Sequence, residues 1–162
     1  MAERYGAPIG AGRPSRGQAV IHPSRSQWSE VAAAARADGF DQLIDLTAVD
    51  YSTYGADRGL PEGVRPERFE VVAGLISHPR GERLRMRVQV PADDPTLPTL
   101  FDVWPGAENL EREVYDMFGV AFEGHPDMSR ILMPEDWSGH PLRKDYDIGA
   151  IPVQFKAASN VR

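Results

Sequence analysis

The sequence predicts an α+β fold: a compact domain of helices and antiparallel or mixed sheet, followed by an extended, largely irregular C-terminal tail. Residues 83–90 alternate apolar and polar side chains, as a half-buried strand does. Residues 26–37 carry apolar side chains at helical spacing. The segment 120–162 contains four prolines and three glycines, which break regular structure. A chain of 162 residues is long enough to build one real core.

The first helix is expected from about Ser26 to Ala37. Ser26 is a suitable N-cap, and Gly39 can end the helix in a left-handed conformation. A strand then follows over residues 40–51, where apolar and acidic residues alternate. Residues 52–66 hold three glycines and two prolines and are expected to form a loop.

Two stronger strands are expected over residues 68–77 and 83–90, joined by a hairpin turn at 78–81. The second of these strands should have one core face and one wet face, as strands of antiparallel sheets do. A second helix is expected over residues 107–118. Gly119 follows it as the residue that ends the helix.

These elements divide the chain into three parts: a flexible basic arm over residues 1–25, an α+β domain over 26–119 and a tail over 120–162. The arm contains four Arg and one Glu and almost nothing to bury. A long segment without regular structure normally wraps another surface, because alone it cannot satisfy its backbone hydrogen bonds. The tail is therefore expected to bind partners.

The composition excludes several classes of function. The chain has no cysteine, so it cannot hold disulfides, cysteine-ligated zinc or its own iron–sulfur cluster. Its net charge is −6, which argues against nucleic-acid binding. The chain shows neither a secretory signal nor an apolar run long enough to cross a membrane. A cytoplasmic protein is expected, with any membrane association made through partners.

Catalytic motifs are missing as well. Glu111 and Glu113 could be considered as general acid and base, but residues two apart on a helix point about 200° apart and cannot flank one bond. His125, Asp127, Asp136, His140 and Asp145 could be imagined as metal ligands, yet no ligand spacing supports that site. A stand-alone metal-dependent hydrolase using His125, His140 and Asp127 therefore stays a remote alternative.

The last third of the chain carries a family resemblance. The segments 111–119, 122–127, 130–132 and 136–146, which read EREVYDMFG, FEGHPD, RIL and DWSGHPLRKDY, closely resemble the C subunit of proton-pumping NADH:quinone oxidoreductase, respiratory complex I. The similarity extends more weakly back to about Trp28. Two departures stand out. Asn109 lies where the family often has an aromatic residue. The family also has a strand before the first helix, where this chain offers only its Gly-, Pro- and Arg-rich arm, so that edge of the sheet is left open.

The resemblance implies a peripheral-arm protein that has no cofactor and lies against the large D subunit, which holds the quinone site, and near the B subunit. FMN and the iron–sulfur clusters would belong to partner subunits, and quinone would be met only through the complex. Such a protein would sit at the cytoplasmic face of the cell membrane without inserting into it. Relatives also serve membrane-bound hydrogenases and other electron-input complexes, and the sequence does not name the electron donor or the quinone.

No catalytic, cofactor-binding or metal-binding residue is expected on this chain; its functional residues are expected at a partner interface. Cationic side chains should form charge pairs across that interface, and aromatic side chains should anchor it, because these types dominate interface energetics. The expected interface residues are Arg112, Glu113, Asp116, Phe118, Phe122, His125, Arg130, Trp137, His140, Arg143, Lys144, Asp145 and Tyr146.

Overall fold

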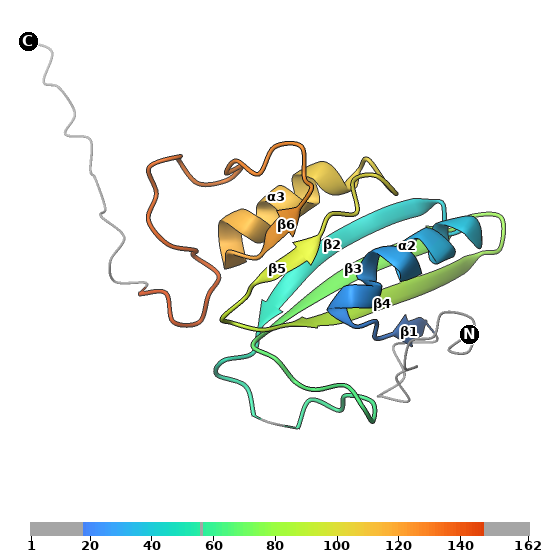
Figure 1. Cartoon of the computed structure of the whole chain (residues 1–162), viewed down its shortest axis with the longest axis horizontal. Helices are drawn as coiled ribbons and strands as arrows, with labels where there is room; N and C mark the ends of the chain where they lie inside the picture. Colours follow the sequence, from blue (N-terminus) through green and yellow to red (C-terminus); the bar gives the residue numbers. More distant parts are fainter. Residues whose placement is uncertain (1–17, 56, 148–162) are drawn as a thin grey trace, which may run out of the picture.

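A computed structural model describes residues 18–55 and 57–147 of the chain (Figure 1), so residues 1–17 of the expected arm and 148–162 of the expected tail lie outside the described residues. Its elements, in chain order, are β1 (Ala19–Ile21), the 3-10 turn η1 (Arg25–Gln27), α2 (Trp28–Ala37), β2 (Gln42–Asp50), β3 (Phe69–Ser77), β4 (Glu82–Val90), β5 (Thr96–Pro98), α3 (Ala107–Phe118) and β6 (Ala121–Glu123).

The main sheet is mixed and has the strand order β1-β4-β3-β2. β3 pairs antiparallel with both β2 and β4, whereas β1 pairs parallel with β4. A second, two-stranded sheet joins β5 and β6 in parallel. The predicted α+β fold with a mixed sheet is confirmed. The expected hairpin turn also forms, with Gly81 in a left-handed conformation and its N–H donating to the His78 carbonyl at 3.2 Å.

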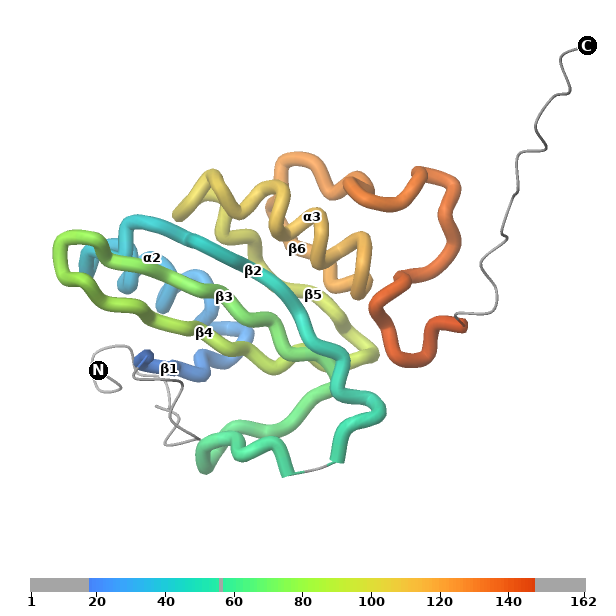
Figure 2. The backbone as a smooth tube through the Cα atoms, turned by 180° about the vertical axis from the view of Figure 1, so that it is seen from behind, coloured from blue at the N-terminus to red at the C-terminus, as the bar shows by residue number. Residues whose placement is uncertain are grey.

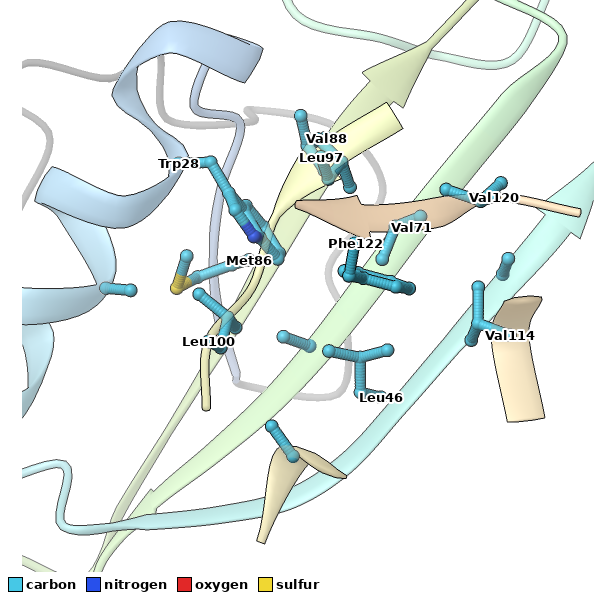
Figure 3. Packing of buried hydrophobic residues seen from close by; sticks show 14 of the residues in the cluster. Trp28, Leu46, Val71, Met86, Val88, Leu97, Leu100, Val114, Val120 and Phe122 are labelled. Atoms are coloured by element: carbon cyan, nitrogen blue, oxygen red, sulfur yellow. The ribbon is translucent and has the colours of Figure 1, made fainter. Parts of the chain in front are cut away.

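The two helices and the small β5–β6 sheet cover one face of the main sheet (Figure 1), and the strands are seen in front of α2 from behind (Figure 2). β4 has the expected two faces: Leu84, Met86 and Val88 are buried, while the arginines between them face the other way. The core lies between the sheet and its cover (Figure 3) and includes Trp28, Leu46, Val71, Met86, Val88, Leu97, Leu100, Val114, Val120 and Phe122. Each large side chain buried there contributes about 1.5–3 kcal/mol to stability.

Two short strands differ from the sequence prediction. Ala19–Ile21, expected within the flexible arm, forms β1 and supplies the sheet edge that was left open. Ala121–Glu123, expected in the irregular tail, forms β6 against Thr96–Pro98. Each has only three residues, so each depends on its pairing partner rather than on a local pattern. Beyond Glu123 the described chain has no helix or strand, as expected.

The first helix also begins differently. Ser24 rather than Ser26 opens the helical segment, and its backbone N–H donates to Gln27 Oε1 at 3.2 Å. This bond is half of a capping box, which satisfies a backbone donor at the helix start. Among the described residues, no helix has both the length and the apolar character needed to cross a membrane.

Candidate functional site

The expected interface residues lie on α3, on β6 and on the irregular segment 124–147, which we call the strap. The strap runs along α3 and then bends around its end (Figures 1 and 2). α3 ends at Gly119, whose φ of 72° is left-handed and whose N–H donates to the Tyr115 carbonyl at 2.8 Å. Gly suits this position because it has no Cβ to clash. The strap is therefore positioned by how α3 ends.

Asp116 is the main anchor of the strap. Its side chain is fully buried, and one oxygen, Oδ2, accepts hydrogen bonds from three consecutive backbone N–H groups, those of Ile131, Leu132 and Met133, at 3.1, 2.8 and 2.8 Å. Its other oxygen accepts from Arg130 Nη1 at 2.5 Å. Burial pushes the pKa of Asp116 upward, but these donors outweigh it and hold the pKa below its usual range.

The open carbonyls at the end of α3 are satisfied by the strap. Nδ1 of His140 lies 3.0 Å from the Asp116 carbonyl, and the Leu142 N–H donates to the Met117 carbonyl at 3.0 Å. Arg143 Nε donates to the Phe118 carbonyl at 2.5 Å. The last carbonyls of a helix have no partner within the helix, so these contacts replace water there. Burial lowers the pKa of His140, which favours the neutral imidazole.

A second buried carboxylate, Asp50 at the end of β2, holds the far end of the strap. It accepts from the Lys144 N–H at 2.9 Å and from Arg68 Nη2 at 2.8 Å. Arg68 in turn bonds Asp145 at 2.7 Å. Burial raises the pKa of Asp50, but the bonds from Arg68, from Lys144 and from Ser52 prevail and hold it well below its usual range. The network ties the strap to the main sheet.

The N-terminal end of the strap is also bound to α3. His125 Nε2 lies 2.9 Å from the Glu108 carbonyl, and 3.9 Å from Glu111 Oε2. Glu111 is fully buried and accepts from the Leu100 N–H at 2.6 Å and from Thr99 Oγ1 at 2.5 Å. Burial raises the pKa of Glu111. The two hydrogen bonds lower the pKa by less, so it stays above its usual value.

Arg112 closes the first bend of the strap. Its guanidinium donates to the carbonyl and hydroxyl oxygens of Ser129 at 3.1 and 3.0 Å, and to the Arg130 carbonyl at 3.1 Å. Arg112, Arg130 and Arg143 therefore all bond within the chain. Their expected role as charge partners across an interface stays a prediction, which contacts within one chain do not test.

The expected aromatic interface residues fall into two groups that differ in exposure. Phe118 and Phe122 are 8% and 3% exposed and belong to the chain's own core, and their expected role as partner anchors stays a prediction. Phe122 points inward because β6 pairs with β5 over the core. Trp137 and Tyr146 are only half-buried on the strap, and Glu113 and Lys144 are exposed. These four remain accessible.

The imagined metal site does not form. In the part of the chain that the structure describes, no three His, Cys, Asp or Glu side chains gather as ion ligands. His125 and His140 each face a backbone carbonyl of α3, and Asp127 accepts the Ser129 N–H at 3.1 Å. His125, His140 and Asp127 therefore serve here as hydrogen-bonding contacts of the strap.

Sequence reasoning missed two residues of this site, Asp50 and Arg68. Asp50 lies in the region of weaker family similarity that extends back to about Trp28, so a signal was present. Arg68 carried none, because its role depends on carboxylates 18 and 77 residues away in sequence.

Comparisons with known proteins agree with this architecture. The family described as respiratory-chain NADH dehydrogenase, 30 kDa subunit, matches residues 21–151. NADH-quinone oxidoreductase subunit 5 of Thermus thermophilus is 50% identical over 142 residues, which cover 85% of this chain and 65% of that protein. The C subunit of the NADH-quinone oxidoreductase of Acidothermus cellulolyticus is 43% identical, covering 89% of this chain and 71% of its own length. The chain thus spans somewhat less than two thirds of the first relative.

Two solved structures are also similar. A trypsin-resistant fragment of Nqo5, residues 1–134, superposes with a TM-score of 0.66 at 43% identity and covers 78% of this chain and 92% of that one. A chain of an archaeal membrane-bound sulfane sulfur reductase superposes with a TM-score of 0.70 at 25% identity, covering 97% of this chain and 92% of its own. The fold is therefore found both in the Nqo5 fragment and in a chain of an archaeal respiratory membrane complex.

Proposed function

Because the chain belongs to the family of the respiratory-chain NADH dehydrogenase 30 kDa subunit, we propose that it is a docking subunit of the peripheral arm of complex I, with no cofactor of its own. In this role it supports electron transfer from NADH, through FMN and iron–sulfur clusters of partner subunits, to quinone, coupled to proton translocation. Its partners are the D and B subunits of complex I, at the cytoplasmic face of the membrane.

The observation that carries this proposal is how the buried carboxylates are used. Asp116 and Asp50 accept backbone N–H groups of the strap, and Glu111 accepts one from Leu100. A general acid or base needs a face open to substrate, whereas these oxygens are occupied by donors of the same chain. These three carboxylates therefore support a structural role for the chain, in which the strap is held in a fixed shape that neighbouring subunits can bind.

A second candidate is the equivalent subunit of another electron-input complex, such as a membrane-bound hydrogenase. The structural similarity to a chain of the sulfane sulfur reductase, which covers 97% of this chain, supports this second candidate. The two candidates share the docking role and differ only in the electron donor of the parent complex.

The test is to tag the chain in its source cells, purify it from detergent-solubilised membranes and identify the co-purifying proteins by mass spectrometry. Recovery of the D and B subunits is expected, together with NADH:quinone activity in the preparation. Deleting the chain should abolish that activity in membranes, and re-expressing it should restore the activity. A chain that purifies alone, with unchanged membrane activity after deletion, would refute the docking role. Activity with another donor but not NADH would favour the second candidate.

A further inference from the structure

The strap displays apolar side chains outward. The described residues include five exposed large hydrophobic residues, and three of them lie on the strap: Ile131, Leu132 and Leu142, at 38%, 60% and 49% exposure. Single exposed apolar residues are common on protein surfaces and need no explanation. Three within twelve residues of an irregular segment form a concentration that marks an interaction site more often than chance exposure does.

The backbone that carries these side chains is held in place by hydrogen bonds to α3. The N–H groups of Ile131 and Leu132 both point at Asp116 Oδ2, and the Leu142 N–H is bonded to the Met117 carbonyl. Since Asp116 and Met117 are adjacent on α3, both stretches of the strap are held at the same end of that helix. A surface ordered before binding loses less conformational entropy when a partner docks.

The charges on this surface indicate the kind of partner. Between residues 126 and 142 the only Arg or Lys, Arg130, is turned inward to Asp116. Glu135 and Asp136 are exposed and make no ion pair with any described residue. The exposed cation of the strap, Lys144, lies beyond this stretch, next to the Asp50 anchor. The outward surface of this stretch is therefore apolar and acidic.

We infer that Ile131, Leu132 and Leu142, flanked by Glu135 and Asp136, form a preformed docking surface for an apolar protein surface bordered by Lys or Arg side chains on a neighbouring subunit. This surface rests on the proposed function and deepens it by naming the chemistry of the partner. Buried apolar area would provide most of the affinity. The acidic border would favour a basic partner and disfavour an acidic one.

The apolar part is tested by comparing Leu132→Asp with Ala33→Asp in the tagged full-length chain. Both add one negative charge at an exposed position, but Ala33 lies on α2, at the other end of the molecule from the strap (Figure 1). Recovery of neighbouring subunits is expected to fall by at least about tenfold for Leu132→Asp and by less than about twofold for Ala33→Asp. Urea unfolding of each purified chain should match the wild type, because neither side chain is buried.

The acidic part is tested by the pair Glu135→Lys and Asp136→Lys together, with Glu30→Lys on α2 as the control. Recovery of neighbouring subunits is expected to fall on the order of tenfold for the double variant, and the wild-type complex should dissociate more readily as the salt concentration rises.

A photo-reactive residue at position 132 should cross-link to a neighbouring subunit, at a site rich in apolar residues and Lys or Arg.

The outcomes separate this inference from the proposed function. If the wild-type chain recovers its neighbours but the Leu132 and Glu135/Asp136 variants do so equally well, the docking surface is wrong and the docking role stands. Cross-links from position 132 to lipid, or to residues 148–162 of the same chain, would also overturn it. If the wild-type chain recovers no neighbours at all, both the docking role and the surface fail.

Discussion

Arg130 binds the Asp116 carboxylate with an N–O distance of 2.5 Å, and its second terminal nitrogen donates to the Gly139 carbonyl at 2.9 Å. One side chain thus connects the end of α3 to two stretches of the strap. Both members of the pair are largely shielded, at 14% and 0% side-chain exposure. Removing one member of such a pair leaves an uncompensated charge, which costs more than the pair contributes.

Asp116→Asn is therefore expected to lower the free energy of unfolding by about 3 kcal/mol. The amide oxygen can still accept from the strap N–H groups, but the charge opposite Arg130 is gone. Urea unfolding gives the loss. Hydrogen exchange should show faster exchange at the amides of Ile131, Leu132 and Met133, whose N–H groups point at this carboxylate.

Glu113→Gln is the matched control, because Glu113 lies on the same helix and is exposed. Its cost should stay within about 0.5 kcal/mol. Equal losses for the two variants, or unchanged exchange of the strap amides in Asp116→Asn, would show that Asp116 is not the anchor.

The fold was predictable where structure is decided locally. The buried residues of α3 recur at helical spacing, and those of β4 recur at every second position, as packing one face on the core requires. Gly119 marks the end of α3. β5 and β6 were not predictable, because three residues are too few to show a period. Their pairing, such as Leu97 with Phe122, depends on chain segments brought together by the rest of the fold.

The sequence pattern located the site but not the direction of its side chains. The block from Glu111 to Tyr146 is where α3 and the strap meet, as the family resemblance indicated. The contact between Asp50 and the Lys144 N–H spans 94 residues, so no local pattern could show it. Arginine beside an acidic helix is compatible with either an internal or an external partner, and only the three-dimensional arrangement decides between them.

Gly119→Ala should damage the junction between α3 and the strap. A methyl group there would lie 2.6 Å from His140 Cδ2 and would also collide with the Arg143 guanidinium. The variant is expected to lose about 1–2 kcal/mol through the left-handed backbone alone, and at least about 1 kcal/mol more through displacement of the strap. Urea unfolding measures the total.

Gly59→Ala isolates the backbone contribution. Gly59 also has a left-handed φ, 61°, but a methyl group there would meet nothing within 4 Å. It should lose only about 1–2 kcal/mol. If Gly119→Ala cost no more than Gly59→Ala, His140 and Arg143 would be free to move aside, and the strap would be less firmly held than its hydrogen bonds indicate.

Asp50 should make the protein sensitive to acid. Its pKa is lower in the folded chain than its ordinary 3.8, so its contribution to stability is complete above about pH 4–5 and is lost as the pH falls below that. Asp50→Asn should flatten the fall in unfolding free energy between about pH 5 and 2 and cost about 3 kcal/mol at neutral pH. Chemical denaturation across this pH range tests both parts.

Asp41→Asn serves as the control for acid sensitivity, since Asp41 is exposed beside the start of β2. Its pH profile should follow the wild type. An Asp50→Asn profile as steep as that of the wild type would mean that other carboxylates, Asp116 first among them, account for the acid loss.

Glu111 should change the pH dependence of stability in the opposite direction to Asp50. Because burial raises its pKa, its contribution favours the folded chain in acid and declines as the pH rises through the folded value. Glu111→Gln can keep both bonds, accepting from the Leu100 N–H and donating to Thr99 Oγ1, so it should cost less than about 1 kcal/mol at neutral pH. Glu111→Ala leaves the Leu100 N–H unpaired and should cost about 2–3 kcal/mol. The stability of the wild type relative to Glu111→Gln should therefore fall as the pH rises above the ordinary pKa of 4.5, and a rise there would contradict the raised pKa.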